Sequence, residues 1–496
     1  MKVKRKTICQ TCRKGKIGCD GKQPACTQCV FRGLSCPGYP SDWTFVPQGC
    51  TVGGHRSGRE RPSLTAAVKG NHRPRLDLQE RPGLGEAASS AVPRPLTAPL
   101  DDLMMFVVRS FVPDANLGPG RGGGIVPPTR VCGSWVEVLP ALASSGNNIA
   151  LSSAINAFAL AMMSGATPST SMVSSAGETY TQALCALHSE LRSAPKSKAL
   201  PSQIIASIMC LLFAELFQPT SLGSWMAHLR GFGESMQLAK PKFFASGIPH
   251  RFFAGARPIL IVLGFITRRT TFLAAEEWKH DPFVETPASP MQKLMSDASV
   301  IPTILETLDG LATRPRELAV VAAGNCVRQL VDVVGSLGRW KATSPTTRAP
   351  LFGCTAISKG DVPCLWFPSI TDANEATHFW AFNALCLATI SQVAVSYPEV
   401  GVELQSLAAW TTEDRIFQET IKLSKRICHS MDYQMQAEMR LYGVSSILLP
   451  LRVAYDVFSA GGARTAKELA FCRSILTRTV AMGHQFVPMF FDASRR

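Results

Sequence analysis

Six cysteines within the first 36 residues constrain this chain more than any other feature. They stand at Cys9, Cys12, Cys19, Cys26, Cys29 and Cys36. Each of the last three lies 17 positions after one of the first three, so the segment is one half-motif written twice. A C-x2-C pair in each half favours zinc, because a tight turn directs both sulfurs at one tetrahedral ion. A module this small buries little apolar surface, so its folding free energy is expected to come largely from the metal.

The number of sulfurs predicts a shared metal centre. Two four-coordinate zinc ions require eight metal–sulfur bonds, and six sulfurs supply them only if two sulfurs bridge both ions. The pseudo-twofold relation makes the first cysteine of each half, Cys9 and Cys26, the natural bridging pair. The other four sulfurs then form two terminal pairs, Cys12 with Cys19 and Cys29 with Cys36. The predicted cofactor is therefore a pair of Zn²⁺ ions.

Positive charge is concentrated on the same short segment. Residues 1–36 hold nine Lys/Arg and one Asp, a net charge of +8 out of +15 for all 496 residues. Basic charge gathered on a small metal module indicates a polyanionic partner, with nucleic acid the first candidate. The run at the start of the chain is also a predicted nuclear import patch. Its basic members are Lys2, Lys4, Arg5 and Lys6.

The segment CQTCRKGKIGCDGKQPACTQCVFRGLSC resembles the fungal zinc binuclear cluster (Zn2Cys6) DNA-binding domain. The resemblance is carried by the six cysteine spacings, the basic run at 13–16 and Pro24 between the halves. The bridging ligands of that family agree with the pair derived above. The resemblance implies a nuclear, sequence-specific regulator of RNA polymerase II transcription that binds double-stranded DNA and acts through the transcription machinery or co-regulators. It also suggests control of a metabolic or secondary-metabolite pathway.

Four basic residues are expected to contact DNA. The resemblance implies that Lys16 reads base edges in the major groove at a CGG half-site, and lysine donation to guanine O6 and N7 suits that role. Arg13, Lys14 and Lys22 are assigned to phosphates, which supply position and salt dependence rather than specificity. The alternative for these three is that they are solvated charges balancing the cluster, whose formal charge with two Zn²⁺ is about −2.

Composition divides the chain into three predicted parts. Residues 1–38 form the zinc module with its basic arm. Residues 39–99 are rich in Pro, Gly, Arg and Ser without an apolar period, which predicts a disordered linker. Its prolines exclude the dimerising coiled coil that the family often places after the cluster, so monomer and homodimer both stay open. Residues 100–491 show helical periodicity and predict an all-α regulatory domain.

The predicted helices of the body carry recognisable start and stop signals. Acidic residues precede the apolar run that begins at Leu103, and Asn147 or Asn148 is expected to cap the next long helix. Ser202 is a predicted helix cap. Helices are also expected over 222–239, 257–279, 290–309 and 372–397, and 341–368 is expected to be an irregular loop. The pattern Trp225-x2-His228-x2-Gly231 faintly resembles the fungal-specific transcription factor regulatory domain.

The sequence shows no convincing catalytic set, so the chain is not expected to be an enzyme. The G-x-G-x-x-G at 118–123 is followed by two prolines that cannot open a helix. His228 with Trp225 is interpreted as a core pair. The ten other cysteines are expected to be reduced thiols, and the apolar runs are interpreted as too short to span a bilayer. Two alternatives stay open: a helical scaffold or ligand-binding protein whose cluster mediates protein contacts, and an enzyme housed in the helical body.

Overall fold

A computed structural model divides the chain into two units, Met1–Glu86 and Ala87–Arg496, and the fold of each is described by itself. The described residues are 11–12, 19, 29–30, 32, 34, 36, 99–113, 132–146, 148–166, 169–193, 199–344, 352–354, 364–400 and 413–492. The predicted linker lies outside these residues except for Pro99.

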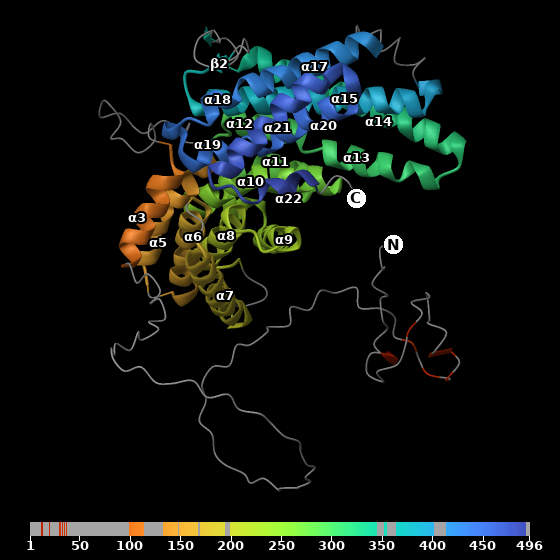
Figure 1. Ribbon diagram of the computed structural model, residues 1–496. Helices are drawn as coiled ribbons and strands as arrows, with labels where there is room; N and C mark the ends of the chain where they lie inside the picture. The colour runs from red at the N-terminus through yellow and green to blue at the C-terminus, as the bar shows by residue number, and fades with distance from the viewer. Residues whose placement is uncertain are drawn as a thin grey trace, which may run out of the picture. The chain divides into compact units, whose positions relative to one another are not determined.

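The first half of the larger unit packs around two apolar helices (Figure 1). Its elements are α3 (Leu100–Phe111), η1 (Cys132–Val138), α5 (Leu139–Ser144), α6 (Ile149–Ala166), α7 (Thr170–Ser193), α8 (Ser202–Phe217), α9 (Leu222–Ala239) and η2 (Pro241–Phe244). α6 contacts α3, α7 and α8. Every residue of α8 from Ile204 to Phe217 is buried. A helix that is apolar on most faces is stable only inside other helices, which places α6 and α8 at the centre of this half.

Two predicted helix caps have different outcomes. Asn148 caps α6 as expected, because its Oδ1 accepts the Leu151 N–H at 2.7 Å. Glu190 of α7 accepts from the Asn148 amide at 2.7 Å and ties the two helices together. The prediction for Ser202 is wrong. Pro201 takes the capping position with an extended backbone, and Ser202 is the first residue within α8.

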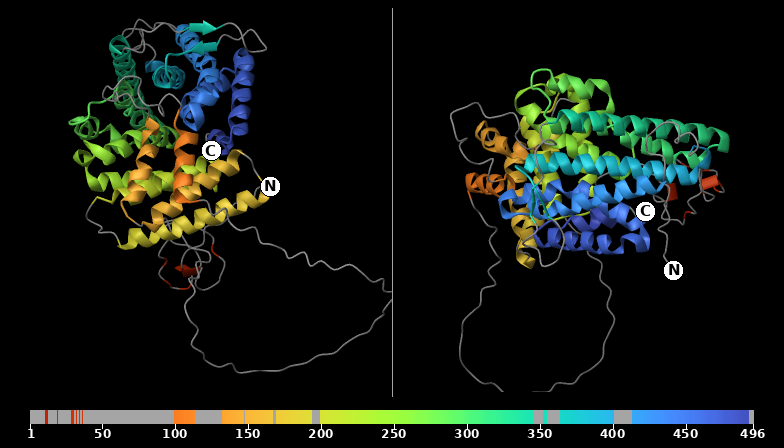
Figure 2. Two further views of the ribbon diagram at one scale, coloured as in Figure 1. Left: turned by 90° about the vertical axis from the view of Figure 1, so that its left-hand side faces the viewer. Right: turned by 90° about the horizontal axis from the view of Figure 1, so that it is seen from above.

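The second half contains the longest helices, which run side by side in the right-hand view of Figure 2. Its elements are α10 (Gly247–Thr267), η3 (Phe272–Ala274), α11 (Glu276–His280), η4 (Asp281–Phe283), α12 (Pro290–Ala298), α13 (Ile301–Asp309), η5 (Leu311–Thr313), α14 (Arg316–Thr343), α15 (Ile370–Ser396), α17 (Glu413–His429), α18 (Met431–Gln434), η7 (Ala437–Met439), α19 (Arg440–Ser446), α20 (Leu448–Ala460), η8 (Gly462–Thr465), α21 (Ala466–Ala481) and α22 (Val487–Asp492). α15 contacts α14, α17 and α20, and one hydrophobic core joins both halves. The prediction of an all-α body is confirmed for the described residues, apart from one short hairpin.

A short hairpin departs from the predicted irregular loop at 341–368. β1 (Phe352–Cys354) pairs antiparallel with β2 (Cys364–Trp366), with Phe352 opposite Trp366 and Cys354 opposite Cys364. Strands of three residues are too short for an alternating pattern to stand out in the sequence. The start of the predicted loop is also helical, because α14 continues to Thr343.

α10 begins ten residues before the predicted helix at 257–279 because a proline is tolerated inside it. Pro258 lacks an N–H and therefore leaves the carbonyl of Ala254 without its helical donor. The side chain of Gln292, from α12, donates to this carbonyl at 3.0 Å. The same Gln292 accepts from the buried Arg257 at both its backbone and side-chain oxygens. In the sequence, Pro258 suggests the start of a helix. The contact with Gln292 replaces the hydrogen bond that the proline removes, so the helix extends on both sides of it.

Gly443 of α19 lies so close to its neighbours that alanine is expected to destabilise the body. A Cβ at this position would overlap the carbonyl oxygen of Gln434 and lie 2.6 Å from the Cβ of Met439. Overpacking against backbone predicts a loss of about 3 kcal/mol for Gly443→Ala. Gly231→Ala is the matched control. It meets nothing within 4 Å on α9, so it is expected to stabilise the body by about 0.5–1 kcal/mol. Urea unfolding followed by circular dichroism measures both, and equal midpoints for the two variants would contradict this packing.

Three described helices are long and apolar enough, by length and composition alone, to cross a membrane. They are Gly247–Thr267, Arg316–Thr343 and Ile370–Ser396. The interpretation that the apolar runs are too short to span a bilayer is therefore wrong by this measure. All three helices also pack within the body, and α15 buries Asn374, Glu375 and His378 against protein neighbours. That the chain has no membrane partner stays a prediction.

Candidate zinc centre and nucleic-acid interface

Four of the six N-terminal cysteines are described, and they form one cluster. Cys12 and Cys29 lie on short helical segments at 11–12 and 29–30 and are 0% and 1% exposed. Cys19 is also buried, and the half-buried Cys36 packs against the other three. The backbone N–H of Leu34 donates to the carbonyl of Cys29 at 3.0 Å, which turns the chain back after the second helical segment. Thiols from both halves of the repeat are thus brought together.

The positions of these cysteines follow the 17-residue repeat. Cys12 and Cys29 occupy equivalent positions, and both are helical and almost fully buried. Cys19 and Cys36 are likewise equivalent, and both pack into the same cluster. Buried thiols gathered from both halves are the donor set that tetrahedral zinc prefers, so the described residues fit the predicted metal.

The complete ligand set stays a prediction. Cys9 and Cys26, the predicted bridging pair, lie outside the described residues. The described residues contain no group of three or more His, Cys, Asp or Glu side chains arranged to hold a metal ion. In the predicted scheme each zinc takes only two of its four ligands from the described cysteines, and the bridging sulfurs supply the other two.

The residues predicted to contact DNA or import factors lie outside the described residues. This holds for Lys16, Arg13, Lys14, Lys22, Lys2, Lys4, Arg5 and Lys6. Their roles rest on the sequence alone. Arg32, at a turn of the second half, is the basic residue of the module that the structure does describe, and it is exposed.

His228, interpreted from the sequence as part of a core pair with Trp225, belongs to a hydrogen-bond network. The hydroxyl of Tyr180 lies 2.7 Å from Glu215 Oε1 and 2.6 Å from His228 Nε2. Burial, followed by the nearby Glu215, raises the pKa of Tyr180 well above its usual value, and burial lowers the pKa of His228 to about 4. Glu215 also accepts the backbone N–H of Thr220 at 2.8 Å. Neither ring titrates near neutrality, so the network serves to join α7, α8 and α9.

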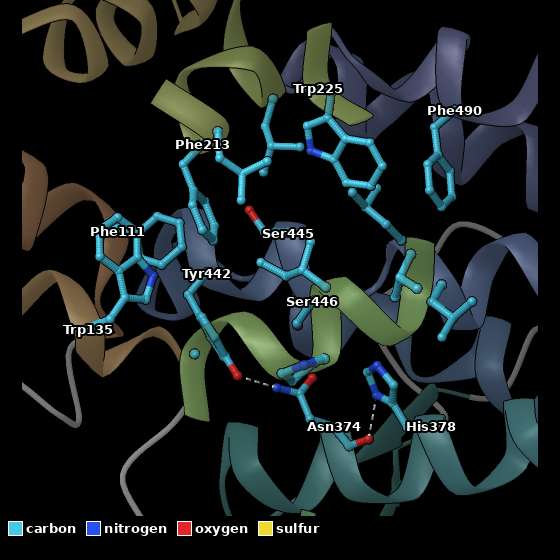
Figure 3. A pocket seen from close by; sticks show the side chains of 18 of the residues that line it. Phe111, Trp135, Phe213, Trp225, Asn374, His378, Tyr442, Ser445, Ser446 and Phe490 are labelled. Atoms are coloured by element: carbon cyan, nitrogen blue, oxygen red, sulfur yellow. Dashed lines mark hydrogen bonds between the residues drawn. The ribbon is translucent and has the colours of Figure 1, made fainter. Parts of the chain in front are cut away.

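A second polar cluster, which the sequence did not single out, lies inside the apolar body (Figure 3). The Asn374 amide donates to the hydroxyl of Tyr442 at 3.0 Å, and His378 Nδ1 lies 2.9 Å from the backbone oxygen of Asn374. These residues line a cavity together with aromatic side chains. Asn374 and His378 stand one helical turn apart in an apolar helix, and that spacing is the signal that could have identified them.

One cysteine of the body is not the reduced thiol that the sequence analysis predicts. Cys185 of α7 is disulfide-bonded, and its partner is not among the cysteines whose side chains the structure describes. Five others in the described body are free thiols as expected: Cys210, Cys326, Cys386, Cys428 and Cys472. The sequence could not show this difference, because spacing along the chain does not tell which cysteines meet in space.

Comparison with known proteins assigns the N-terminal module to a domain family. Residues 7–42 match the fungal Zn(2)-Cys(6) binuclear cluster domain, which confirms the predicted family of the module. A Schizosaccharomyces pombe protein named as an uncharacterized transcriptional regulatory protein is 64% identical over 28 residues. That match spans 6% of this chain and 4% of the length of the relative. No solved structure matches the chain.

Proposed function

We propose that this chain, whose residues 7–42 are a fungal Zn(2)-Cys(6) binuclear cluster domain, is a zinc-dependent DNA-binding regulator of transcription. The observation that carries the proposal is the burial of Cys12, Cys19 and Cys29 in one cluster within a segment that matches this domain. The net charge of +8 on residues 1–36 supports a polyanionic partner. Bound zinc would hold the thiolates of both halves together and so maintain the fold of the module.

Within this proposal the module reads DNA through a short basic segment. Lys16 donates to guanine at CGG half-sites, and Arg13, Lys14 and Lys22 contact phosphates. Zinc is held as two ions by the six cysteines, with Cys9 and Cys26 bridging. The support is the two-fold cysteine repeat, the number of available sulfurs and the position of the basic run between Cys12 and Cys19.

The helical body would act as the regulatory part of a nuclear protein without a catalytic step. We place the module at 1–38, a linker at 39–99 and the regulatory domain at 100–491. The basic patch at 2–6 would support nuclear import, and the body would contact co-regulators of RNA polymerase II transcription. The family resemblance supports a role in a metabolic or secondary-metabolite pathway. The chain would act as a monomer or as a homodimer.

A binding titration tests the proposal directly. A fluorescent duplex with a CGG triplet is titrated with the zinc-loaded full-length chain, and anisotropy is compared with that of a permuted triplet at one fixed salt concentration. The proposal expects tighter binding to CGG and loss of binding after zinc is removed with a chelator. Absence of binding to any duplex by the zinc-loaded chain at low salt would contradict it.

Lys16→Ala is expected to weaken binding to the CGG duplex by roughly tenfold and to remove its advantage over the permuted triplet. Lys22→Ala is the matched control, because loss of a phosphate contact should weaken binding to both duplexes equally. The two variants are compared in the same anisotropy assay. A Lys16→Ala chain with the affinity and selectivity of the wild type would rule out Lys16 as the base reader.

A further inference from the structure

Two cysteines stand opposite each other in the hairpin of the helical body. In the antiparallel pairing of β1 with β2, the register partner of Cys354 is Cys364. Directly opposite residues of an antiparallel pair have Cα atoms about 4.5–5.5 Å apart and share one face of the sheet. A disulfide bond needs Cα atoms about 4.4–6.8 Å apart. The backbone register therefore places these two residues at a separation that a disulfide bond can span.

The face of β2 that carries Cys364 packs on α18. The Sγ of Cys364 donates to Asp432 Oδ2 at 3.3 Å, so this cysteine carries a thiol proton. Trp366 lies two positions later on the same face, and its ring centroid is 5.6 Å from that of Tyr433. Cys354 belongs to this face by its register. The body therefore holds one member of the cysteine pair in place through the contacts of β2 with α18.

Cys364 is more accessible than the free thiols of the described body. It is half-buried, whereas these thiols are all buried: Cys210, Cys326, Cys386, Cys428 and Cys472. Oxidation of cysteine depends on exposure, so a small oxidant can reach Cys364 while the body stays folded. The disulfide-bonded Cys185 lies on α7, at the opposite end of the body from β2 in Figure 1. That separation excludes Cys185 as a disulfide partner for either hairpin cysteine.

We propose that Cys354 and Cys364 form a reversible disulfide bond, with a low-mass disulfide such as oxidised glutathione as the oxidant. One protein thiolate attacks a sulfur of the oxidant, forms a mixed disulfide and releases one glutathione thiolate. The opposite thiolate then attacks the protein sulfur of the mixed disulfide and releases the second glutathione. The two thiols of the chain lose two protons and two electrons in total, and the two reduced glutathione molecules carry both.

The bond changes how the hairpin is joined to two helices. In the reduced chain, Asp432 of α18 accepts from Cys364 and pairs with Arg478 of α21 at 2.6 Å. Oxidation removes the thiol proton, so Asp432 keeps its ion pair with Arg478 and loses the donor from β2. The bond also closes a covalent ring over residues 354–364, which restricts the hairpin in the unfolded chain. The redox state of the pair is therefore coupled to the contact between β2 and α18.

Peptide mapping of the zinc-loaded full-length chain after incubation with oxidised glutathione tests the proposal. Remaining thiols are alkylated, and the single-chain band of a non-reducing gel is digested with trypsin and chymotrypsin. Cleavage after Phe352, Lys359 and Trp366 leaves residues 353–359 joined to residues 360–366 only if the bond has formed. We expect the joined peptides from most chains, and their loss after treatment with dithiothreitol. Their absence, with both cysteines alkylated or carrying glutathione, would overturn the proposal.

Two variants assign the bond to this pair of cysteines. In Cys364→Ser the serine can keep the hydrogen bond to Asp432, so the variant should fold and give no joined peptides. Cys386→Ala is the matched control, because Cys386 is fully buried on α15 and its removal should leave the yield of joined peptides unchanged. The assignment would be contradicted if Cys386→Ala abolished the bond. It would also be contradicted if Cys354 of the Cys364→Ser chain bonded as readily to another cysteine of the same chain.

Discussion

Replacement of Cys12 by serine is expected to release zinc from the module and to weaken binding to a CGG duplex by at least about 100-fold. Cys12 is fully buried in the cysteine cluster, so a serine hydroxyl, which stays protonated near neutral pH, would stand where a thiolate is needed. The bridging scheme ties the two ions together, so loss of one terminal ligand should disturb both. Metal analysis and anisotropy measure the two effects on the same full-length sample.

The 17-residue repeat predicts the same result for a second cysteine. Cys29 is equivalent to Cys12 and just as buried, so Cys29→Ser should reduce zinc content and DNA binding to a similar extent. Cys364→Ser is the matched control, because Cys364 lies in β2 and donates to Asp432 at 3.3 Å, a role that serine can keep. The account would be contradicted by a Cys12→Ser chain that retains two zinc ions and wild-type affinity.

Acidification from pH 7 to pH 5 is expected to destabilise the helical body by about 5 kcal/mol through three buried histidines. Burial lowers the pKa values of His228 and His378 to about 4 and that of His484 to about 3. In the unfolded chain all three titrate near their ordinary value of about 6.5. The unfolded state therefore binds protons first, so this contribution is fully present above about pH 6.5 and is lost as the pH falls toward the folded pKa values.

Urea unfolding of the full-length chain at pH 7 and pH 5, followed at 222 nm, measures this effect. The carboxylates with lowered pKa, such as Glu306 with a pKa of about 2, lose their contribution only below about pH 4.5 and do not interfere. His378→Gln should remove about a third of the difference between the two pH values. Equal stability at pH 7 and pH 5 in the wild type would show that these histidines are not held neutral by burial.

Local sequence patterns predict much of this molecule because the interactions behind them are local. The cysteine repeat lies within 28 residues, and its family is confirmed by the match at 7–42. α9, whose predicted span at 222–239 agrees with the structure, has Ser221 as a side-chain cap at its start. Caps and periodicity act within one or two turns, so they can be identified without knowledge of the rest of the fold.

The differences between sequence and structure come from contacts between distant residues. Pro258 suggests a helix start, but Gln292, 34 positions later, supplies the hydrogen bond that lets α10 continue through it. Asn374, which lines the cavity, donates to Tyr442, which lies 68 positions away. Cys185 forms a disulfide that no local spacing indicates. Such pairings are set by how helices pack, which periodicity alone does not determine.

Selection of binding sites from a random duplex library by the zinc-loaded full-length chain tests the central claim most directly. The account predicts enrichment of CGG triplets that disappears when zinc is removed. Two triplets at one fixed separation would establish a homodimer, and a single triplet would establish a monomer. If the zinc-loaded chain enriches no sequence more strongly than the zinc-free chain does, the result contradicts the claim that this protein is a zinc-dependent, sequence-specific DNA-binding regulator.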